Sequence, residues 1–443
     1  MSYLIYPAAT AVVLGILVFV HEFGHYAVAK LCGVRVEVFS LGFGKRLLGF
    51  TRGNTDYRLS LLPIGGYVKM AGENPLESRS GDPGEFMSHP RWQRFLIAIA
   101  GPAMNILLAI GVLTGVYMHH YEHPAYLEQP TSIATVIPNS AAEKAGLKPG
   151  DLITRVADLN NPTWEQLIPK VLLNPNQPVE MTIQRAGQTL EVTVTPQAAG
   201  AERMGDAGIL PLNPVLVASL TDLNSPAAKA GIKPGDQILT IGGSTVNNMT
   251  DLVDDLQRAK DSPTEIKVLR EKKELAIMVQ PKLGEVASGT KRYMIGIAPD
   301  QFMHVDKLPF PAAIDRAYSE CRTNSILIFE LVGKMIQGKG NVRQVSGPIM
   351  IGKISGQAAM EKGWTPLLIV MAIISLNLAV FNLFPIPILD GGLMLMLLIE
   401  SVMRRDIKQE IKERVYQAAF VFLILFAVVV IYNDVAKNLP GLS

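Results

Sequence analysis

Four stretches of the chain consist almost entirely of apolar residues and are long enough to cross a membrane. They run from Met1 to Val20, Phe95 to Met118, Gly363 to Leu389 and Val415 to Asn433, and each is followed by charged or polar residues. The hydrocarbon core of a bilayer is spanned by about 20 apolar residues in a helix. The pattern therefore predicts a multi-span α-helical membrane protein with four transmembrane helices and both termini on one side.

The first of these stretches is interpreted as a retained span. It has no charged residue and runs directly into the ionisable sequence HEFGH, from His21 to His25. A signal peptide would instead end its apolar core at a small-residue cleavage site.

The distribution of basic residues predicts the orientation. Lys and Arg near span ends are retained in the cytoplasm. Those between the first and second spans include Lys30, Arg35, Lys45, Arg46, Arg52, Arg58, Lys69, Arg91 and Arg94, and those between the third and fourth are Arg404, Arg405, Lys408, Lys412 and Arg414. Both termini and the long central block are therefore expected outside, which is the periplasm in a Gram-negative cell.

The central block contains an internal repeat. The sequence NSAAEKAGLKPGD at 139–151 returns as NSPAAKAGIKPGD at 224–236, with ten of thirteen positions identical at an offset of 85. Each copy is typical of a short helix, a turn and an alternating strand. The repeat predicts two small α+β domains, at 119–213 and 214–300.

These two domains resemble PDZ domains of the bacterial protease type. The glycine-hydrophobic pair expected in a peptide-binding loop, Gly208-Ile209 and Gly296-Ile297, lies at the end of each copy, which indicates a circularly permuted order. PDZ domains bind an extended peptide as an added strand. The alternative is that the two domains are rigid spacers without a ligand.

Two further segments flank the spans. Alternating residues between Gly33 and Met70, on both sides of turn residues 52–54, predict a β-hairpin that could enter the membrane and offer an edge strand to a substrate. The alternative is a hairpin that only caps a cytoplasmic loop. Residues 301–362 are amphipathic and are expected to form a connector on the membrane surface. Residues 1–118 and 363–443 would then form the two membrane-embedded halves.

The composition agrees with a membrane protein and excludes other classes. Hydrophobic residues make up 49% of the chain and charged residues only 18%, whereas soluble domains are about a quarter charged. A net charge of +2 provides no strong positive electrostatic field that would attract nucleic acid. Two cysteines, Cys32 and Cys321, cannot form a disulfide framework or a zinc site of the CxxC type.

The HEFGH sequence carries the most specific chemistry. It fits the pattern HExxH, in which a helix places two histidines at i and i+4 on one face to bind zinc, with the glutamate as general base. Ionisable groups at the end of an apolar span are costly and are functional candidates. We therefore predict that His21 and His25 bind a metal and that Glu22 is a catalytic base.

A third ligand is expected, because catalytic zinc takes three protein ligands and keeps a position for water. The third span ends in NLFPIPILDGG, which places Asp390 on the same side of the membrane as HEFGH. Pro385 and Pro387 prevent a regular helix there, and irregular backbone at membrane depth is tolerated when it is buried in protein or lines a cavity. Asp390 is the predicted third ligand; the alternative is a simple turn at the end of a span.

Taken together, these motifs resemble the site-2 protease family over nearly the whole chain. They are HEFGH in the first span, GPAMN at 101–105 in the second, the two PDZ-like repeats, and SLNLAVFNLFPIPILDGG at 375–392. The resemblance implies a zinc metalloendopeptidase of the inner membrane that acts in regulated intramembrane proteolysis and the envelope stress response. Its implied substrates are single-pass transmembrane proteins, namely an anti-sigma factor already shortened by a first protease, and remnant signal peptides.

The resemblance also implies roles for individual residues. One Zn²⁺ per chain would be bound by His21, His25 and Asp390, with Glu22 as the base and the site near the cytoplasmic side. Asn382 would help to hold the substrate. We extend the expected substrate-binding surface to Pro385 and Pro387 beside it and to Gly65 and Gly66 in the hairpin.

A different class of function is a non-catalytic membrane scaffold that uses the PDZ-like pair to bind periplasmic peptides. Glu22 discriminates the two hypotheses, because a scaffold or a metal store needs no base between two ligands.

Overall fold

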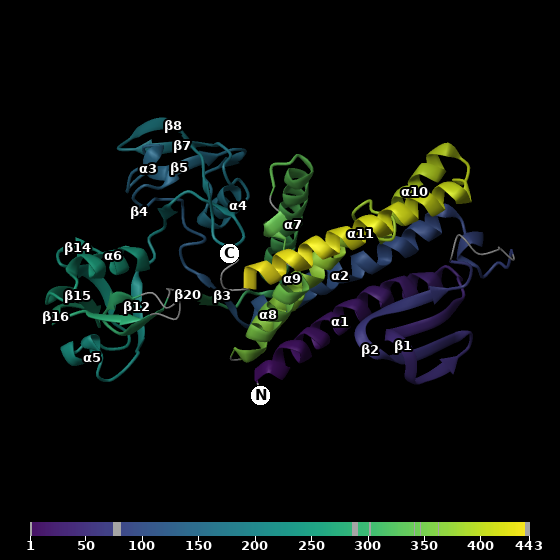
Figure 1. Ribbon diagram of the computed structural model, residues 1–443, viewed down its shortest axis with the longest axis horizontal. Coiled ribbons are helices and arrows are strands. Elements are labelled where there is room, and N and C mark those ends of the chain that lie inside the picture. Colours follow the sequence, from purple (N-terminus) through teal and green to yellow (C-terminus); the bar gives the residue numbers. More distant parts are fainter. Residues whose placement is uncertain are drawn as a thin grey trace. The chain divides into compact units, whose positions relative to one another are not determined.

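The computed structural model describes residues 2–73, 81–285, 291–300, 303–340, 342–345, 347–361 and 363–438. The chain divides into two compact units, which are considered separately (Figure 1). Unit 1 comprises Met1–Tyr121 and Lys307–Ser443, and unit 2 comprises Glu122–Asp306.

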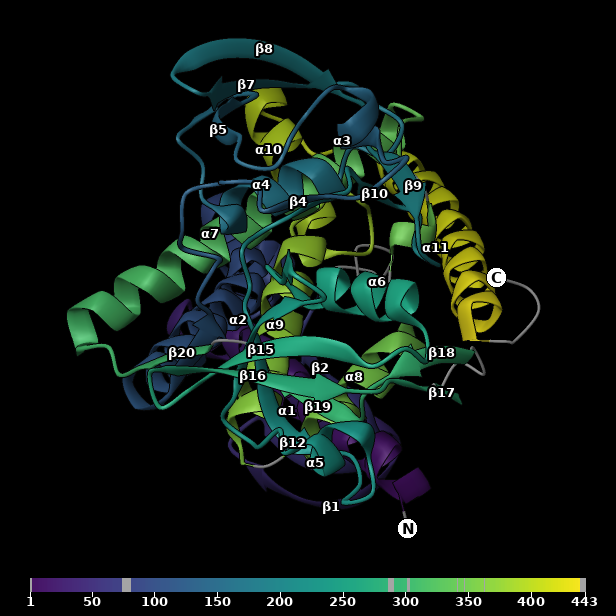
Figure 2. The same cartoon turned by 90° about the vertical axis from the view of Figure 1, so that its left-hand side faces the viewer.

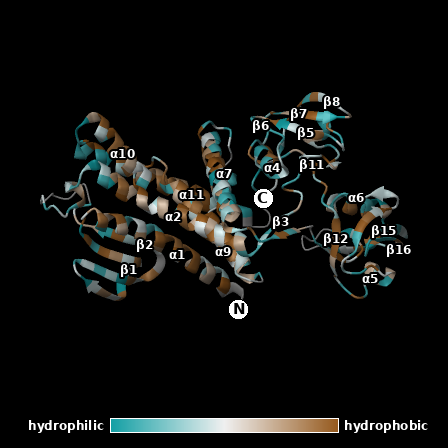
Figure 3. Cartoon of the chain, turned by 180° about the vertical axis from the view of Figure 1, so that it is seen from behind, coloured by the Kyte–Doolittle hydropathy of each residue, from teal (hydrophilic) through white to brown (hydrophobic). Residues whose placement is uncertain are grey.

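In the described part of unit 1, four helices are long and apolar enough to cross a membrane, as predicted. They are α1 (Ser2–Leu31), α2 (Arg91–His119), α9 (Thr365–Asn382) and α11 (Gln409–Asn438), and Figure 3 shows their predominantly hydrophobic colouring. Two boundaries differ from the expectation. The first helix continues to Leu31, so that HEFGH lies inside it, and the third ends at Asn382, because the prolines that follow cannot continue a helix.

Three more helices pack around these four. They are α7 (Phe310–Ile336), α8 (Pro348–Met360) and α10 (Asp390–Met403). Helix α7 packs against α2 through the small buried residues Ala313 and Ala317, while α8 packs against α1. The segment expected to be a surface connector therefore covers faces of the membrane helices. Its placement at the lipid surface stays a prediction.

The segment after α1 forms two long strands, β1 (Val36–Arg52) and β2 (Thr55–Met70). The first part of β1 pairs with both ends of β2, since Val38 lies opposite Lys69 on one side and Asp56 on the other. The two curved strands thus form a sheet four strands wide, in the order 66–70, 36–41, 56–60 and 48–52. Residues 66–70 lie at one edge of this sheet.

Unit 2 contains two β-rich domains with separate cores (Figure 2). Buried residues of the first include Ile153, Trp164 and Ile183, and those of the second include Ile238 and Leu252. The first domain consists of β4 (Thr135–Val136), α3 (Ala141–Lys144), β5 (Leu152–Val156), β6 (Leu159–Asn160), α4 (Trp164–Leu172), β7 (Val179–Arg185), β8 (Gln188–Val194), β9 (Gln197–Ala199), β10 (Met204–Asp206) and β11 (Ile209–Leu210). Its main sheet has the order β6-β5-β7-β8.

The second domain repeats this arrangement with β12 (Val215–Leu220), α5 (Pro226–Ala230), β13 (Gln237–Ile241), β14 (Ser244–Thr245), α6 (Met249–Ala259), β15 (Thr264–Arg270), β16 (Lys273–Val279), β17 (Lys282–Glu285), β18 (Lys291–Met294) and β19 (Ile297–Asp300). Its sheet has the order β16-β15-β13-β12-β19, with β19 at an edge. A short ribbon of β3 (Tyr121–Pro124) and β20 (Met303–Asp306) contains the first and last residues of unit 2.

The last residue of each repeated motif is a buried aspartate bound to an arginine. Arg185 donates to both carboxylate oxygens of Asp151, from Nε at 2.6 Å and Nη2 at 2.7 Å. Burial alone would raise the pKa of Asp151, but the Arg185 guanidinium and the Lys148 N–H outweigh burial and lower it. Arg270 and Asp236 repeat the arrangement at 2.7 Å, and the pKa of Asp236 is lowered in the same way.

We expect Arg185→Met to destabilise the first domain at neutral pH, because it leaves the buried carboxylate of Asp151 without its cationic partner. A lowered carboxyl pKa stabilises the fold above the unfolded value near 4, and this contribution is lost as the pH falls through the folded value. The difference between variant and wild type should therefore shrink below about pH 4. The fluorescence of Trp164, the one tryptophan in this domain, reports its unfolding.

Arg155→Met provides the control. Arg155 makes an exposed ion pair with Glu191 at 4.0 Å, and such pairs contribute about 0–1 kcal/mol. An equal loss of stability in both arginine variants would contradict the assigned role of the buried pair.

Candidate metal centre

Two histidines on α1 form one side of the centre. His21 and His25 are separated by four residues and therefore share a helix face, and each is 8% exposed. Their Nε2 atoms lie 3.2 Å apart. The HEFGH spacing thus brings two imidazole nitrogens to one point, as the sequence predicts.

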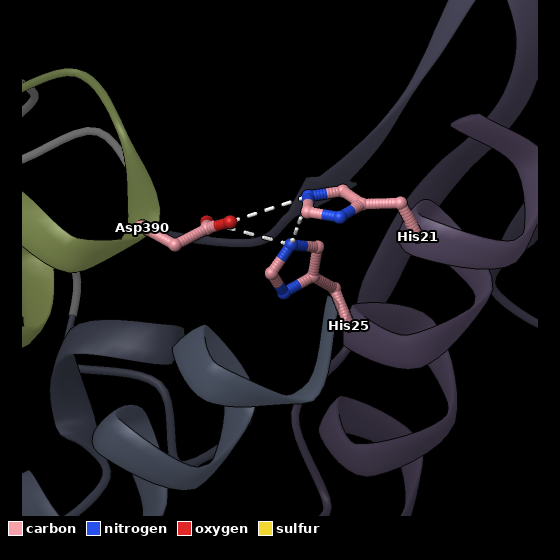
Figure 4. A group of neighbouring side chains, drawn as sticks. All are labelled: His21, His25 and Asp390. Carbon is pink, nitrogen blue, oxygen red and sulfur yellow. Dashed lines mark hydrogen bonds and ion pairs between the residues drawn. The ribbon is translucent and has the colours of Figure 1, made fainter. Parts of the chain in front are cut away.

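The start of α10 brings a carboxylate to the same point. Asp390 Oδ2 lies 3.2 Å from His21 Nε2, and Asp390 Oδ1 lies 3.4 Å from His25 Nε2 (Figure 4). Two residues before Asp390, the backbone of Ile388 has a φ of 93°, which is unusual for a β-branched residue. Gly391 allows the helix to begin here, because a Cβ at this position would lie 2.3 Å from the Leu383 carbonyl oxygen.

The surroundings of the histidines fit a zinc ion. His25 Nδ1 lies 2.7 Å from the Ile97 carbonyl oxygen, which can only accept, so Nδ1 carries the proton and Nε2 keeps a lone pair towards the centre. The ligand atoms of His21, His25 and Asp390 all lie within 4.8 Å of one another. Two imidazole nitrogens and one carboxylate oxygen are a ligand set of catalytic zinc sites.

Helix α2 leaves space for this arrangement at Gly101. A Cβ there would lie 2.3 Å from His25 Nε2 and 2.9 Å from the Cε1 atom of His21. No side chain longer than hydrogen fits at this position without displacing the two imidazoles.

Glu22 lies beside the histidines and is held by the hairpin. The backbone N–H of Val68, on the edge segment of β2, donates to Glu22 Oε2 at 3.0 Å. Glu22 lines a cavity together with His21, His25 and Asp390. This cavity has a volume of about 600 Å³.

The cavity also includes part of the predicted substrate-binding surface. Gly65, Gly66 and Asn382 lie on its wall, next to apolar residues that include Val18 and Leu378. Pro385 and Pro387 are not among the described residues that line this cavity. The two prolines instead lie in the non-helical segment between α9 and α10.

A second cavity, of about 570 Å³, shares Asp390, Met70 and Glu73 with the first. Its wall includes further charged side chains: Glu37, Lys69, Arg94, Glu400 and Lys412. A polar space therefore adjoins the metal centre.

The predicted peptide-binding loops occupy equivalent positions in the two domains of unit 2. Gly208 and Gly296 have φ angles of 75° and 78°. A Cβ on either would lie within 2.5 Å of the Cβ of the serine that caps the repeated helix, Ser140 or Ser225. Ile209 and Ile297 begin strands β11 and β19.

Sequence reasoning did not identify three partners of the centre: the Ile97 carbonyl, the Val68 N–H, and Asn105, whose side-chain nitrogen lies 3.3 Å from His21 Nδ1. Asn105 ends the GPAMN motif, which was a usable signal. The other two are backbone groups, which every sequence contains.

Comparisons with known proteins place these features in a family. Residues 9–426 match the model of peptidase family M50. Regulator of sigma-E protease RseP of Salmonella typhimurium is 30% identical over 97% of this chain and 98% of its own length, and protease RseP of Yersinia pestis is 30% identical over 99% and 100%. A Vibrio cholerae protein with zinc metalloprotease in its name is 32% identical over 97% of this chain and 98% of its own length. Among solved structures, the PDZ domain of an SdrC-like protein from Listeria monocytogenes matches 20% of this chain and 90% of its own, with 21% identity and a TM-score of 0.18.

We expect Gly101→Ala to lower the zinc content of the purified protein substantially, because the added methyl group would displace His25. Gly111→Ala is the matched control on the same helix, since a Cβ at Gly111 has nothing within 4 Å among the described atoms. Metal analysis of both variants tests the expectation. Full zinc occupancy in Gly101→Ala would show that the two histidines do not bind where their geometry indicates.

Proposed function

Because the chain belongs to peptidase family M50 and is a membrane zinc metalloprotease, we propose that it is an intramembrane endopeptidase with one zinc ion per chain. The observation that carries this proposal is the convergence of His21, His25 and Asp390 beside Glu22 within apolar helices. Metal storage or scaffolding would give no reason for a carboxylate base at this position.

The proposed substrates are single-pass transmembrane proteins. Relatives named as regulators of sigma-E protease support an anti-sigma factor, shortened beforehand by another protease, as one substrate in an envelope stress response. Remnant signal peptides are a second proposed class, because they too are short apolar helices.

In the proposed reaction, zinc bound by the two histidines and Asp390 would polarise the scissile carbonyl and lower the pKa of water at the site. Glu22 then accepts the proton of the attacking water and returns it to the leaving amine. Since Oε2 of Glu22 accepts from the Val68 N–H, we assign the proton transfer to Oε1.

The substrate must be unwound before it reacts, because a helix binds its own carbonyls in i to i−4 hydrogen bonds. Alternate residues of a strand direct their backbone groups to the same edge. Because the N–H of Val68 points to Glu22, we expect Gly66, two residues earlier on the wall of the cavity, to present its N–H and C=O there as well. We propose that the unwound peptide pairs with this edge and that the Asn382 amide binds its backbone.

The protein is proposed to lie in the inner membrane with both termini and unit 2 in the periplasm. Water would then reach the centre from the cytoplasmic side through the charged cavity that adjoins Asp390. The lining residues Lys69, Arg94 and Lys412 belong to the segments whose basic residues predict a cytoplasmic position.

The two domains of unit 2 are proposed to be circularly permuted PDZ domains. Strand β19 lies at the edge of its sheet and begins at Ile297, so it could accept a peptide as an additional strand. A second proposed role is that of a size filter that excludes bulky substrates.

The reaction is tested by Glu22→Gln, which keeps the size and hydrogen bonding of the side chain but removes the base. We expect zinc content near that of the wild type and a fall of about 10²–10⁴-fold in cleavage of a model transmembrane peptide, the usual contribution of proton transfer. Undiminished turnover would exclude Glu22 as the base.

Metal binding and substrate binding should separate at the third span. Asp390→Ala should lose zinc together with activity, since two histidines remain without the carboxylate. Asn382→Ala should keep zinc but reduce crosslinking to a substrate trapped by Glu22→Gln. Zinc content and crosslinking yield are measured in both variants; loss of zinc in Asn382→Ala with full occupancy in Asp390→Ala would reverse the two roles.

A further inference from the structure

Asn105 is the fully buried partner of one metal ligand. It lies on α2 with no exposed surface, and its Nδ2 lies 3.3 Å from His21 Nδ1. Its backbone is fixed from a third helix, because Ser375 Oγ on α9 donates to the Asn105 carbonyl oxygen at 2.9 Å. The contact therefore joins α1, α2 and α9 at the level of the metal centre.

The contact determines which nitrogen of His21 carries the proton. With Nδ2 towards the ring, Asn105 donates to Nδ1, and the proton of a neutral imidazole is then on Nε2. An Nε2–H can donate to Asp390 or to His25, but it cannot bind a metal through that nitrogen. With the amide turned by 180°, Oδ1 faces the ring, Nδ1 carries the proton, and Nε2 offers its lone pair to the centre.

The first orientation leaves the oxygen of the amide unused. Asn105 Oδ1 is buried and has no hydrogen-bond partner among the described residues. A buried acceptor without a partner is destabilising. Turned towards His21, the same oxygen would accept the Nδ1 proton.

His25 and His21 differ in the partner of their Nδ1 atoms. The Ile97 carbonyl fixes the Nδ1–H form of His25 permanently, since a carbonyl oxygen has no second orientation that donates. Among the described residues, His21 Nδ1 has no such fixed acceptor and faces an amide that can either donate or accept.

We infer that Asn105 is a positioning residue that selects the tautomer of His21 and so controls zinc binding. This inference rests on the proposed function, because it assigns His21 as a ligand. Rotation of one amide lets His21 either donate to Asp390 or bind the metal without moving a helix. Aspartate at this position would only accept and would hold His21 permanently in the metal-binding form.

The test measures the zinc dissociation constant of the full-length purified protein by competition with a chelator. Asn105→Ala should weaken zinc binding about 10–100-fold, the usual effect of removing a residue that orients a ligand. Asn105→Asp should retain wild-type affinity, because it keeps an acceptor of nearly the same size. Ser375→Ala is the matched control, because it removes the hydrogen bond to the Asn105 backbone but keeps the Asn105 side-chain amide. This variant should also bind zinc with wild-type affinity.

A second readout is independent of zinc. The ¹⁵N chemical shifts of labelled histidine distinguish the two tautomers, and a His21→Ala variant assigns the signal. In protein kept free of zinc by a chelator, Asn105→Asp should shift His21 to the Nδ1–H form relative to the wild type. An unchanged tautomer would overturn the inference even if Asn105→Ala failed to fold.

The outcomes separate this inference from the proposed function. Equal zinc affinity in wild type and Asn105→Ala would overturn the role of Asn105 and leave the proposed function intact. Equal losses in the Ala and Asp variants would also overturn it, because they would reflect packing rather than an acceptor. A wild-type protein that binds no zinc would instead refute the metal centre itself.

Discussion

Two imidazoles and a carboxylate lie among apolar helices, and the arrangement of unit 1 depends on holding them there. Polar groups in such surroundings are costly unless each has a partner. Helix α2 supplies a carbonyl oxygen to His25, an amide to His21, and a glycine where a side chain would collide with both. The crossing of α1 and α2 is therefore constrained by the chemistry of the ligands as much as by apolar packing.

The break in the helix of the third span shortens the distance between Asn382 and Asp390. In a continuous helix, Asp390 would lie about 12 Å farther along the axis than Asn382. The non-helical segment between α9 and α10 instead lets both residues line one cavity. The backbone groups that the break releases lie against protein, as shown by the close approach of Gly391 to the Leu383 carbonyl, which makes irregular structure tolerable at membrane depth.

The convergence of the three candidate ligands could be predicted from the sequence, because their chemistry is carried by side chains at recognisable positions. His21 and His25 needed only the helical period, and Asp390 needed only an acidic group at the end of a broken span. The partners could not be predicted in the same way. Whether Ile97 or Val68 meets a functional side chain depends on how α2 and β2 pack against α1, and a backbone group has no signature in sequence. The extent of α1 was also missed, because charged residues after Val20 indicate the end of an apolar stretch but not the end of a helix.

The position of Val68 would connect the proposed substrate binding to the proposed catalysis. Its N–H holds Glu22, and it belongs to the edge segment proposed to pair with the unwound substrate. A peptide paired beside Gly66 would have its backbone fixed relative to the base, whereas a helical peptide would not, since its carbonyls are engaged internally. Selectivity would then depend on how readily a substrate helix opens. Glycine and proline lower helix stability by about 1 and 3 kcal/mol, so helix-breaking residues near the scissile bond would favour cleavage more than any particular side chain would.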